Sequence, residues 1–208
     1  MQFSSLSSHI AAALIVAALT PQVSRADTAI RHQNILLDAA SSVVDYKKNT
    51  VEFKDIVISQ GDIKVEANHA VAEASGLNFK TGEWTFTGDV RIHVEKRGNL
   101  RSDEAVVDFK DGLIEKATII GKPAQFEQQR AASDQLARGH AGQIVYEPAA
   151  GVVRLSNDAW LSDGHNEIRG PLLVYNIRQQ HVEAVTQPGN DDRVHITIDP
   201  NQDERKPK

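Results

Sequence analysis

In the stretch Phe86-Thr87-Gly88-Asp89-Val90-Arg91-Ile92, a Gly-Asp pair separates two short segments that each carry large apolar residues. Gly and Asp tolerate the backbone angles of tight turns, so the pair predicts a turn between the two apolar segments. Similar stretches follow at residues 120–126 and 155–161, and residues 53–58 match more loosely. Each copy has an anchor, a small or branched apolar residue, and the anchors are 34, 34 and 35 residues apart: Ile56, Val90, Ala124 and Ala159. This near-constant spacing predicts a repeated strand-turn-strand unit, although regular turns give any all-β chain some periodicity.

Apolar and polar residues also alternate along most of the chain. The pattern is clear in residues 51–54 and 63–66, and again in residues 194–198 near the C-terminus. A period of two over short runs is typical of half-buried strands. Turn-forming residues such as Gly61-Asp62 and Asp163-Gly164-His165 separate these runs. No helical pattern of ten or more residues follows residue 26, so we expect an all-β fold in which the sheet rolls up.

The N-terminus has the pattern of a secretory signal. Residues 10–19 form an unbroken apolar run, which is shorter than the roughly 20 residues that a membrane-spanning helix needs. Pro21 follows the run, and Ser24-Arg25-Ala26 places small residues where a signal peptidase reads. We expect cleavage after Ala26; an uncleaved anchor is the alternative. The expected organisation is a signal peptide over residues 1–26, one β domain over residues 27–199 and a disordered polar tail over residues 200–208.

Charge and composition exclude several classes of function. The chain has 23 Lys and Arg against 28 Asp and Glu, a formal net charge of −5. Such a chain is not built to bind nucleic acid by neutralising phosphates. It contains no Cys, so the fold depends on its core rather than on disulfides, and cysteine-based zinc or redox chemistry is excluded.

Nothing in the sequence singles out a catalytic or metal site. The run Asp163-Gly164-His165-Asn166-Glu167 has the residue types of a ligand set, but a hydrated hairpin turn is the favoured interpretation. No nucleophile elbow, phosphate-binding loop or metalloprotease motif is present. We expect no catalytic residues, no metal and no cofactor, and therefore no enzyme.

The inward-facing positions of the expected strands are mostly Val, Ile, Leu and Ala. A rolled sheet that is not filled by bulky aromatic residues can hold a ligand in its interior. A glycan-binding or glycan-cleaving jelly roll would instead need exposed aromatics in a polar groove. The candidates for that role are Trp84 and Trp160.

The repeat stretches, taken in order, resemble a known family. Residues 56–67 are similar to the opening repeat of the LptA/OstA-type lipopolysaccharide transport proteins, and residues 121–126 look like their Pro-Ala-x-Phe turn. The resemblance continues through later strands and covers roughly residues 33–198. It implies a twisted β-jelly roll, open at both ends, whose apolar groove carries the acyl chains of lipid A in the periplasm. It also implies head-to-tail self-association and a bridge from an inner-membrane LptC-like component to an outer-membrane LptD-like translocon. The related LptC-type component, which is membrane-anchored, is the alternative.

On this interpretation two sets of residues carry the function. The residues expected to bind lipopolysaccharide are Ile35, Ile56, Ile58, Val90, Ile92, Phe126, Tyr146, Leu155, Leu161 and Tyr175. The residues expected to form the partner-binding sheet edges are Ile35, Leu36, Leu37, Val194, Ile196 and Ile198.

Overall fold

A computed structural model describes residues 35–73, 81–95, 98–111, 113–129, 136–176, 179, 181–186 and 193–200. The expected signal peptide and all of the expected tail except Pro200 lie outside these residues. The described residues form strands and turns and contain no helix, which confirms the all-β expectation. The strands are β1 (Leu36–Asp38), β2 (Ser41–Asp45), β3 (Thr50–Gln60), β4 (Ile63–Glu73), β5 (Gly82–Val94), β6 (Gly98–Lys110), β7 (Leu113–Gln129), β8 (Leu136–Glu147), β9 (Val152–Ser162), β10 (Glu167–Asn176), β11 (His181–Val185) and β12 (His195–Thr197).

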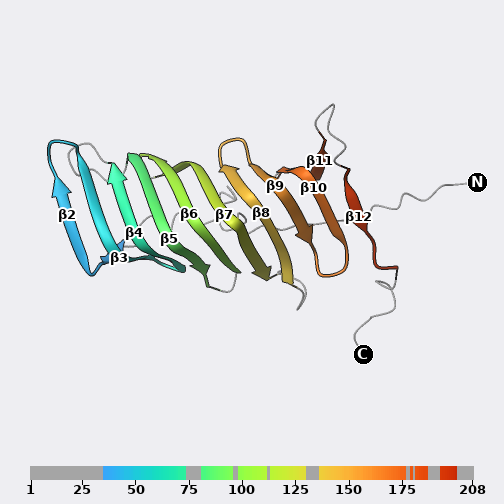
Figure 1. Cartoon of the computed structure of the whole chain (residues 1–208), viewed down its shortest axis with the longest axis horizontal. Coiled ribbons are helices and arrows are strands. Elements are labelled where there is room, and N and C mark those ends of the chain that lie inside the picture. Colours follow the sequence, from blue (N-terminus) through green and yellow to red (C-terminus); the bar gives the residue numbers. More distant parts are fainter. Residues whose placement is uncertain are drawn as a thin grey trace, which may run out of the picture.

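All the strands belong to one antiparallel sheet. From β3 to β11 each strand pairs with the next in the chain, while β1 and β2 both pair with β3, and β12 pairs with β10. The strands therefore lie side by side in chain order along the length of the molecule (Figure 1). In the part of the chain that the structure describes, no pairing joins the first strands to the last. The sheet is thus a roll that is open at both ends, as expected.

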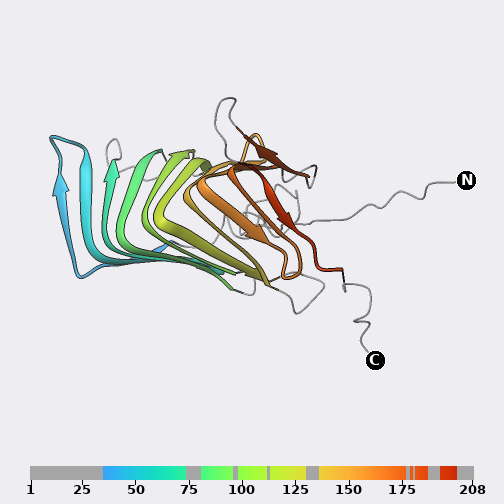
Figure 2. The same ribbon diagram turned by 45° about the vertical axis from the view of Figure 1, so that its right-hand side comes forward.

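A row of irregular positions crosses the sheet at mid-strand. We call it the bulge row; its residues have no directly paired partner in either neighbouring strand, and they are residues 55, 68, 88–89, 103, 121–123, 142, 157–158 and 171. Asp55, Asp89, Asn157 and Asp158 have positive φ angles between 49° and 64°, which Asp and Asn adopt more readily than most residues. Bulges bend a strand and increase its twist, and Figure 2 shows the strands bending at mid-length.

The repeated unit predicted from the sequence is confirmed by this row. Each anchor follows the bulge row directly, and each is at most 1% exposed: Ile56, Val90, Ala124 and Ala159. In β7 the row passes through Gly121, where an added Cβ would lie 2.5 Å from the backbone nitrogen of Ala124. The repeat therefore has a structural cause. Each of these strands bends at the bulge row, and the anchor residue that follows the bend is buried.

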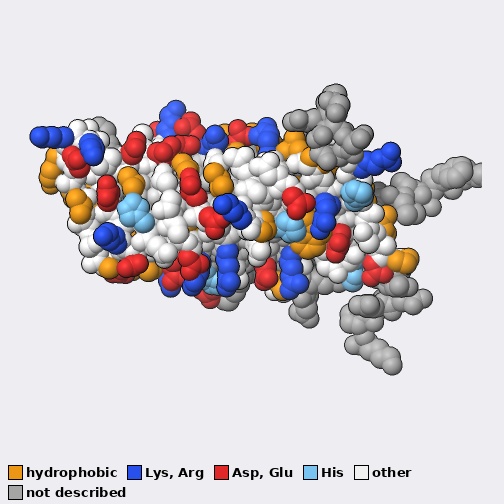
Figure 3. All heavy atoms as spheres, in the orientation of Figure 1, with side chains coloured by type: hydrophobic (Ala, Val, Ile, Leu, Met, Phe, Trp, Pro, Cys, Tyr) orange, Lys and Arg blue, Asp and Glu red, His pale blue; other side chains and the backbone are white. Residues whose placement is uncertain are grey.

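The bulge row divides the bent sheet into two halves that face each other across one core. The aromatic half comprises β2, β11 and residues 50–54, 69–73, 82–87, 104–110, 113–120, 143–147, 152–156 and 172–176. The aliphatic half comprises β1, β12 and residues 56–60, 63–67, 90–94, 98–102, 124–129, 136–141, 159–162 and 167–170. Buried residues of both halves belong to one hydrophobic cluster, since each strand turns alternate side chains inward. On the face seen in Figure 3, acidic and basic side chains mingle over the middle strands.

Candidate functional site

The interior between the two halves is the first candidate site. Most of the predicted lipid-binding residues lie in the buried cluster: Ile56, Val90, Phe126, Tyr146, Leu155, Leu161 and Tyr175. Ile58 and Ile92 are half-buried and contact the cluster. Ile35 is instead exposed and directly precedes β1. The structure therefore brings nine of the ten residues to one continuous apolar interior and places the tenth at the end of the roll.

The aromatic half of this interior is more bulky than the sequence analysis expected. Phe53, Trp84 and Phe86 form a stacked series, with ring centroids 6.0 Å and 5.9 Å apart. The expectation of an interior that is mostly Val, Ile, Leu and Ala is wrong for this region, because β3 and β5 direct their aromatic side chains to the same place. Trp84 is buried, so it is not an exposed residue on which a glycan could stack.

Phe126 is held in a similar way on the aliphatic half. Its ring lies over Gly139, where an added Cβ would come within 2.4 Å of the ring and 2.7 Å of Leu161. Phe126, Gly139 and Leu161 are direct cross-strand neighbours. The deepest predicted lipid-binding residues thus already contact protein atoms, and they form the floor of the interior.

Half-buried apolar residues surround this floor. Besides Ile58 and Ile92, the residues that contact the core are Val65, Val107, Phe109, Ile114, Ile168, Val182 and Ala184. In β3–β7 and β10 they lie farther from the bulge row than the buried residues next to it, such as Ile56, Ala105 and Ala124. These seven lie outside the predicted lipid-binding set, although the alternating pattern already placed Val65, Val107 and Phe109 on the inward phase. They form an apolar margin around the buried floor.

Polar groups interrupt the interior at few described positions. Ser102 and Gln128 are buried, and the Ser102 Oγ and Gln128 Oε1 atoms have no hydrogen-bond partner within the described protein. The phenol of Tyr175 is affected by the same environment, since burial raises its pKa above the ordinary 10.0. A charged group would be disfavoured here, whereas hydrocarbon would not.

The run of residues 163–167 forms the predicted hairpin turn between β9 and β10. The Asp163 carboxylate accepts hydrogen bonds from the backbone N–H groups of His165 (2.9 Å) and Asn166 (2.7 Å). Across the described ranges, no group of three His, Asp or Glu side chains could hold a metal ion. The Asp163 carboxylate therefore closes a turn.

The two ends of the roll are the second candidate site. Leu36 and Val43, at the first end, are 62% and 63% exposed, and Ile196 and Ile198, at the other, are 56% and 70% exposed. β1 and β2 pair only with β3, and β12 only with β10, among the described strands. Each of these strands thus has one edge with unpaired backbone groups, the geometry that accepts an added strand. All six predicted edge residues lie in or directly beside β1 and β12.

Among the residues that the structure describes, no helix is long and apolar enough to cross a membrane.

Comparison with known proteins adds a family match. Residues 71–181 match the family described as the LptA/(LptD N-terminal domain) LPS transport protein. The lipopolysaccharide export system protein LptA of Escherichia coli K12 is 30% identical over 136 residues, which cover 64% of this chain and 71% of that protein. The export system protein LptH of Pseudomonas aeruginosa is 27% identical over 119 residues, covering 57% and 68%. A crystal structure of that LptH, described as the periplasmic LptA homologue, aligns with 82% of this chain and 99% of its own, at 22% identity and a TM-score of 0.43.

Proposed function

Because this chain belongs to the LptA/(LptD N-terminal domain) family of lipopolysaccharide transport proteins, we propose that it carries lipopolysaccharide through the periplasm towards the outer membrane. The observation that carries the proposal is the continuous apolar interior between the two half-sheets. The lipid A acyl chains would lie along this interior, and the phosphorylated sugars would remain in water.

The gradient from buried floor to half-buried margin suits a carrier that must release its cargo. Burial of hydrocarbon contributes about 0.8 kcal/mol per methylene. Complete burial of several acyl chains would exceed the practical limit of non-covalent affinity, about −20 kcal/mol, and release would be very slow. Contact with the margin residues, such as Ile58, Ile92 and Phe109, gives partial burial instead.

The open ends support a role as one element of a bridge. An inner-membrane LptC-like component would pair with the β1–β2 end, and an outer-membrane LptD-like translocon would pair with the β11–β12 end. A second copy of the chain could extend the bridge head to tail, because the free edges at the two ends are both available for strand addition. The function proposed is transport without catalysis, in keeping with relatives that are named as export proteins.

Site-specific photocrosslinking in cells tests the proposal. A photoreactive residue at Ile58 or Phe109 should capture lipopolysaccharide, because both side chains are half-buried against the core. Matched positions on the outer face, Glu52 and Arg154, are exposed and should capture little. Capture only at Glu52 and Arg154 would contradict an interior path for the lipid.

A further inference from the structure

The outer face of the aliphatic half carries a cross-strand row of aromatic and basic side chains. His140 of β8 pairs directly with Trp160 of β9, Trp160 with Arg169 of β10, and Arg169 with His195 of β12. These side chains point away from the core, since the neighbours of His140 and Trp160 in their own strands are buried. An imidazole, an indole, a guanidinium and a second imidazole therefore lie in series across four adjacent strands.

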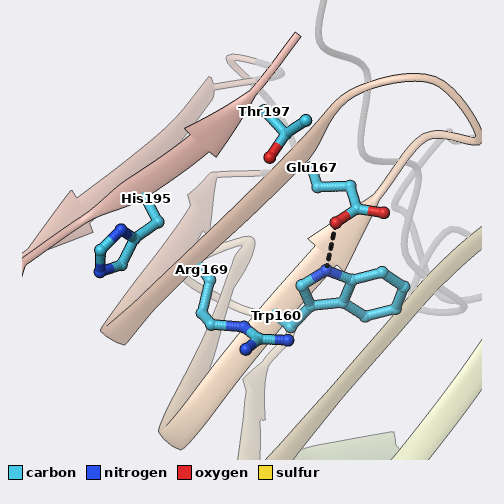
Figure 4. Close-up of a pocket in the computed structure, with 5 residues that line it drawn as sticks. All are labelled: Trp160, Glu167, Arg169, His195 and Thr197. Carbon is cyan, nitrogen blue, oxygen red and sulfur yellow. Dashed lines mark hydrogen bonds between the residues drawn. The ribbon is translucent and has the colours of Figure 1, made fainter. Parts of the chain in front are cut away.

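A hollow of about 410 Å³ lies on this row, lined by Trp160, Glu167, Arg169, His195 and Thr197. Figure 4 shows the five side chains gathered where β9, β10 and β12 meet. The volume is within the range of small-molecule sites, roughly 300–1,000 Å³. The lining combines one flat aromatic surface with basic, acidic and hydroxyl groups, unlike the apolar interior on the opposite face of the sheet.

The indole that forms one wall of the hollow is held in place from two sides. The Trp160 Nε1–H donates a hydrogen bond to the Glu167 carboxylate at 3.3 Å, which Figure 4 also shows. The His140 ring stacks on the indole with a centroid distance of 5.1 Å and an interplanar angle of 23°. His140 approaches from β8, whereas the other residues that line the hollow belong to β10 and β12. The indole is thus positioned before any ligand arrives.

Arg169 has no such fixed role within the protein. Its guanidinium forms no ion pair or hydrogen bond with any residue that the structure describes, and its side chain is exposed at the edge of the hollow. By comparison, two other exposed arginines on the sheet are engaged: Arg91 pairs with Asp89 and Arg154 with Glu147. An unpaired guanidinium beside an ordered indole can take an anionic group in bidentate geometry.

We propose that this hollow binds a pyranose sugar that carries an anionic substituent. The indole of Trp160 would contact the C–H face of the ring, and Glu167 and Thr197 would hydrogen-bond its hydroxyl or amino groups. Arg169 and His195 would meet the phosphate or carboxylate. The phosphorylated sugars of a lipopolysaccharide and the carboxylated sugars of a cell-wall glycan offer the same chemistry. The site is separate from the acyl-chain interior, so it stands apart from the transport proposal.

Nuclear magnetic resonance of the full chain tests this site with an internal control. The chain has two tryptophans; Trp160 lines the hollow and Trp84 is buried in the core. Glucosamine 6-phosphate should shift the Trp160 indole N–H signal saturably and leave the Trp84 signal in place. Glucosamine alone and inorganic phosphate alone should bind at least ~10-fold more weakly, because each lacks one half of the contacts. Equal binding of phosphate and sugar phosphate, or a stationary Trp160 signal, would overturn the proposal.

A pair of matched variants separates the site from general charge effects. Arg169→Gln should weaken glucosamine 6-phosphate binding by ~10-fold or more, as expected for loss of a charge-assisted hydrogen bond. Arg101→Gln removes the same charge from the outer face of the same half, on β6, and should change binding by less than ~2-fold, since it lies outside the hollow. Equal losses in the two variants would contradict a specific site.

Two further ligands identify the source of the sugar. Lipopolysaccharide stripped of its acyl chains and a disaccharide muropeptide would each be titrated against the Trp160 signal. Tighter binding of the first supports a sugar contact during transport, and tighter binding of the second supports a cell-wall contact. Failure of both to bind better than inorganic phosphate would overturn the site. Neither ligand has acyl chains, so this failure would leave the crosslinking test at Ile58 unaffected.

Discussion

The long strands β3–β10 and the short strands at the two ends bury their side chains very differently. Leu155 and Leu173, in the middle of the roll, are completely buried, whereas Leu36, Val43 and Ile196 at the ends are more than half exposed. In the middle, each strand has a neighbour on both sides and a facing half-sheet above it. The middle therefore buries most of the apolar core, whereas the ends leave apolar side chains and backbone groups exposed.

The two ends also differ from each other. At the C-terminal end, Asp199 donates its backbone N–H to the Asn166 amide oxygen at 3.3 Å, and its carboxylate lies 3.5 Å from the His165 ring. These contacts tie the segment after β12 to the β9–β10 turn. At the N-terminal end, β1 and β2 combine backbone pairing with exposed apolar side chains such as Ile35 and Tyr46. The first end therefore offers the more apolar contact surface.

The largest expected effect concerns the stability of the fold, which should depend far more on side chains in the middle of the roll than on side chains at its ends. Leu155→Ala removes a completely buried side chain and should lower the free energy of unfolding by about 3 kcal/mol. Ile196→Ala, at a position 56% exposed, should change it by less than about 0.5 kcal/mol. Urea denaturation of the two variants makes the comparison, and similar losses in both would show that the end strands contribute to the core.

The second prediction concerns assembly, which should depend on the end strands and not on the middle of the roll. Deletion of residues 194–208 removes β12 and should weaken the proposed head-to-tail association at least ~10-fold, because the strand edge proposed to pair with a second copy is lost. Deletion of residues 201–208 alone, the matched control, should leave association intact. Light scattering over a range of protein concentrations measures the effect. A full-length chain that stays monomeric at every concentration would argue against self-assembly.

The smallest expected effect concerns pH. Burial raises the pKa of Tyr175 above 10.0, so the folded state favours the protonated phenol more than the unfolded chain does. The stability linked to this group is therefore present below about pH 10 and is lost as pH rises above that value. Tyr175→Phe should reduce the fall in unfolding free energy between roughly pH 9 and pH 11. Tyr46→Phe, at the exposed N-terminal end, is the control, and an unchanged slope in Tyr175→Phe would contradict the prediction.

The rolled sheet of repeated strands could be predicted from sequence because its determinants are local. The alternation around Val51 and Phe53 and the turn residues Asp55, Asp89 and Asp158 specify strands and bends through backbone preferences of single residues. The 34-residue spacing then placed the buried anchors correctly. The seven margin residues outside the predicted set show the limit of this reasoning. Alternation indicates which side chains point inward, but how deeply each one is buried depends on the half-sheet that faces it.

The sequence by itself determined that this protein is an all-β repeat with an apolar inward face and a family resemblance in ordered motifs. Tertiary structure alone decided that β11 and β12 both pair with β10, that Phe53, Trp84 and Phe86 stack, and that Trp160 meets His140 and Arg169. The physical reason is register. Residues far apart in the chain become neighbours only when strands pair, and a shift of one residue would send every side chain of a strand to the opposite face.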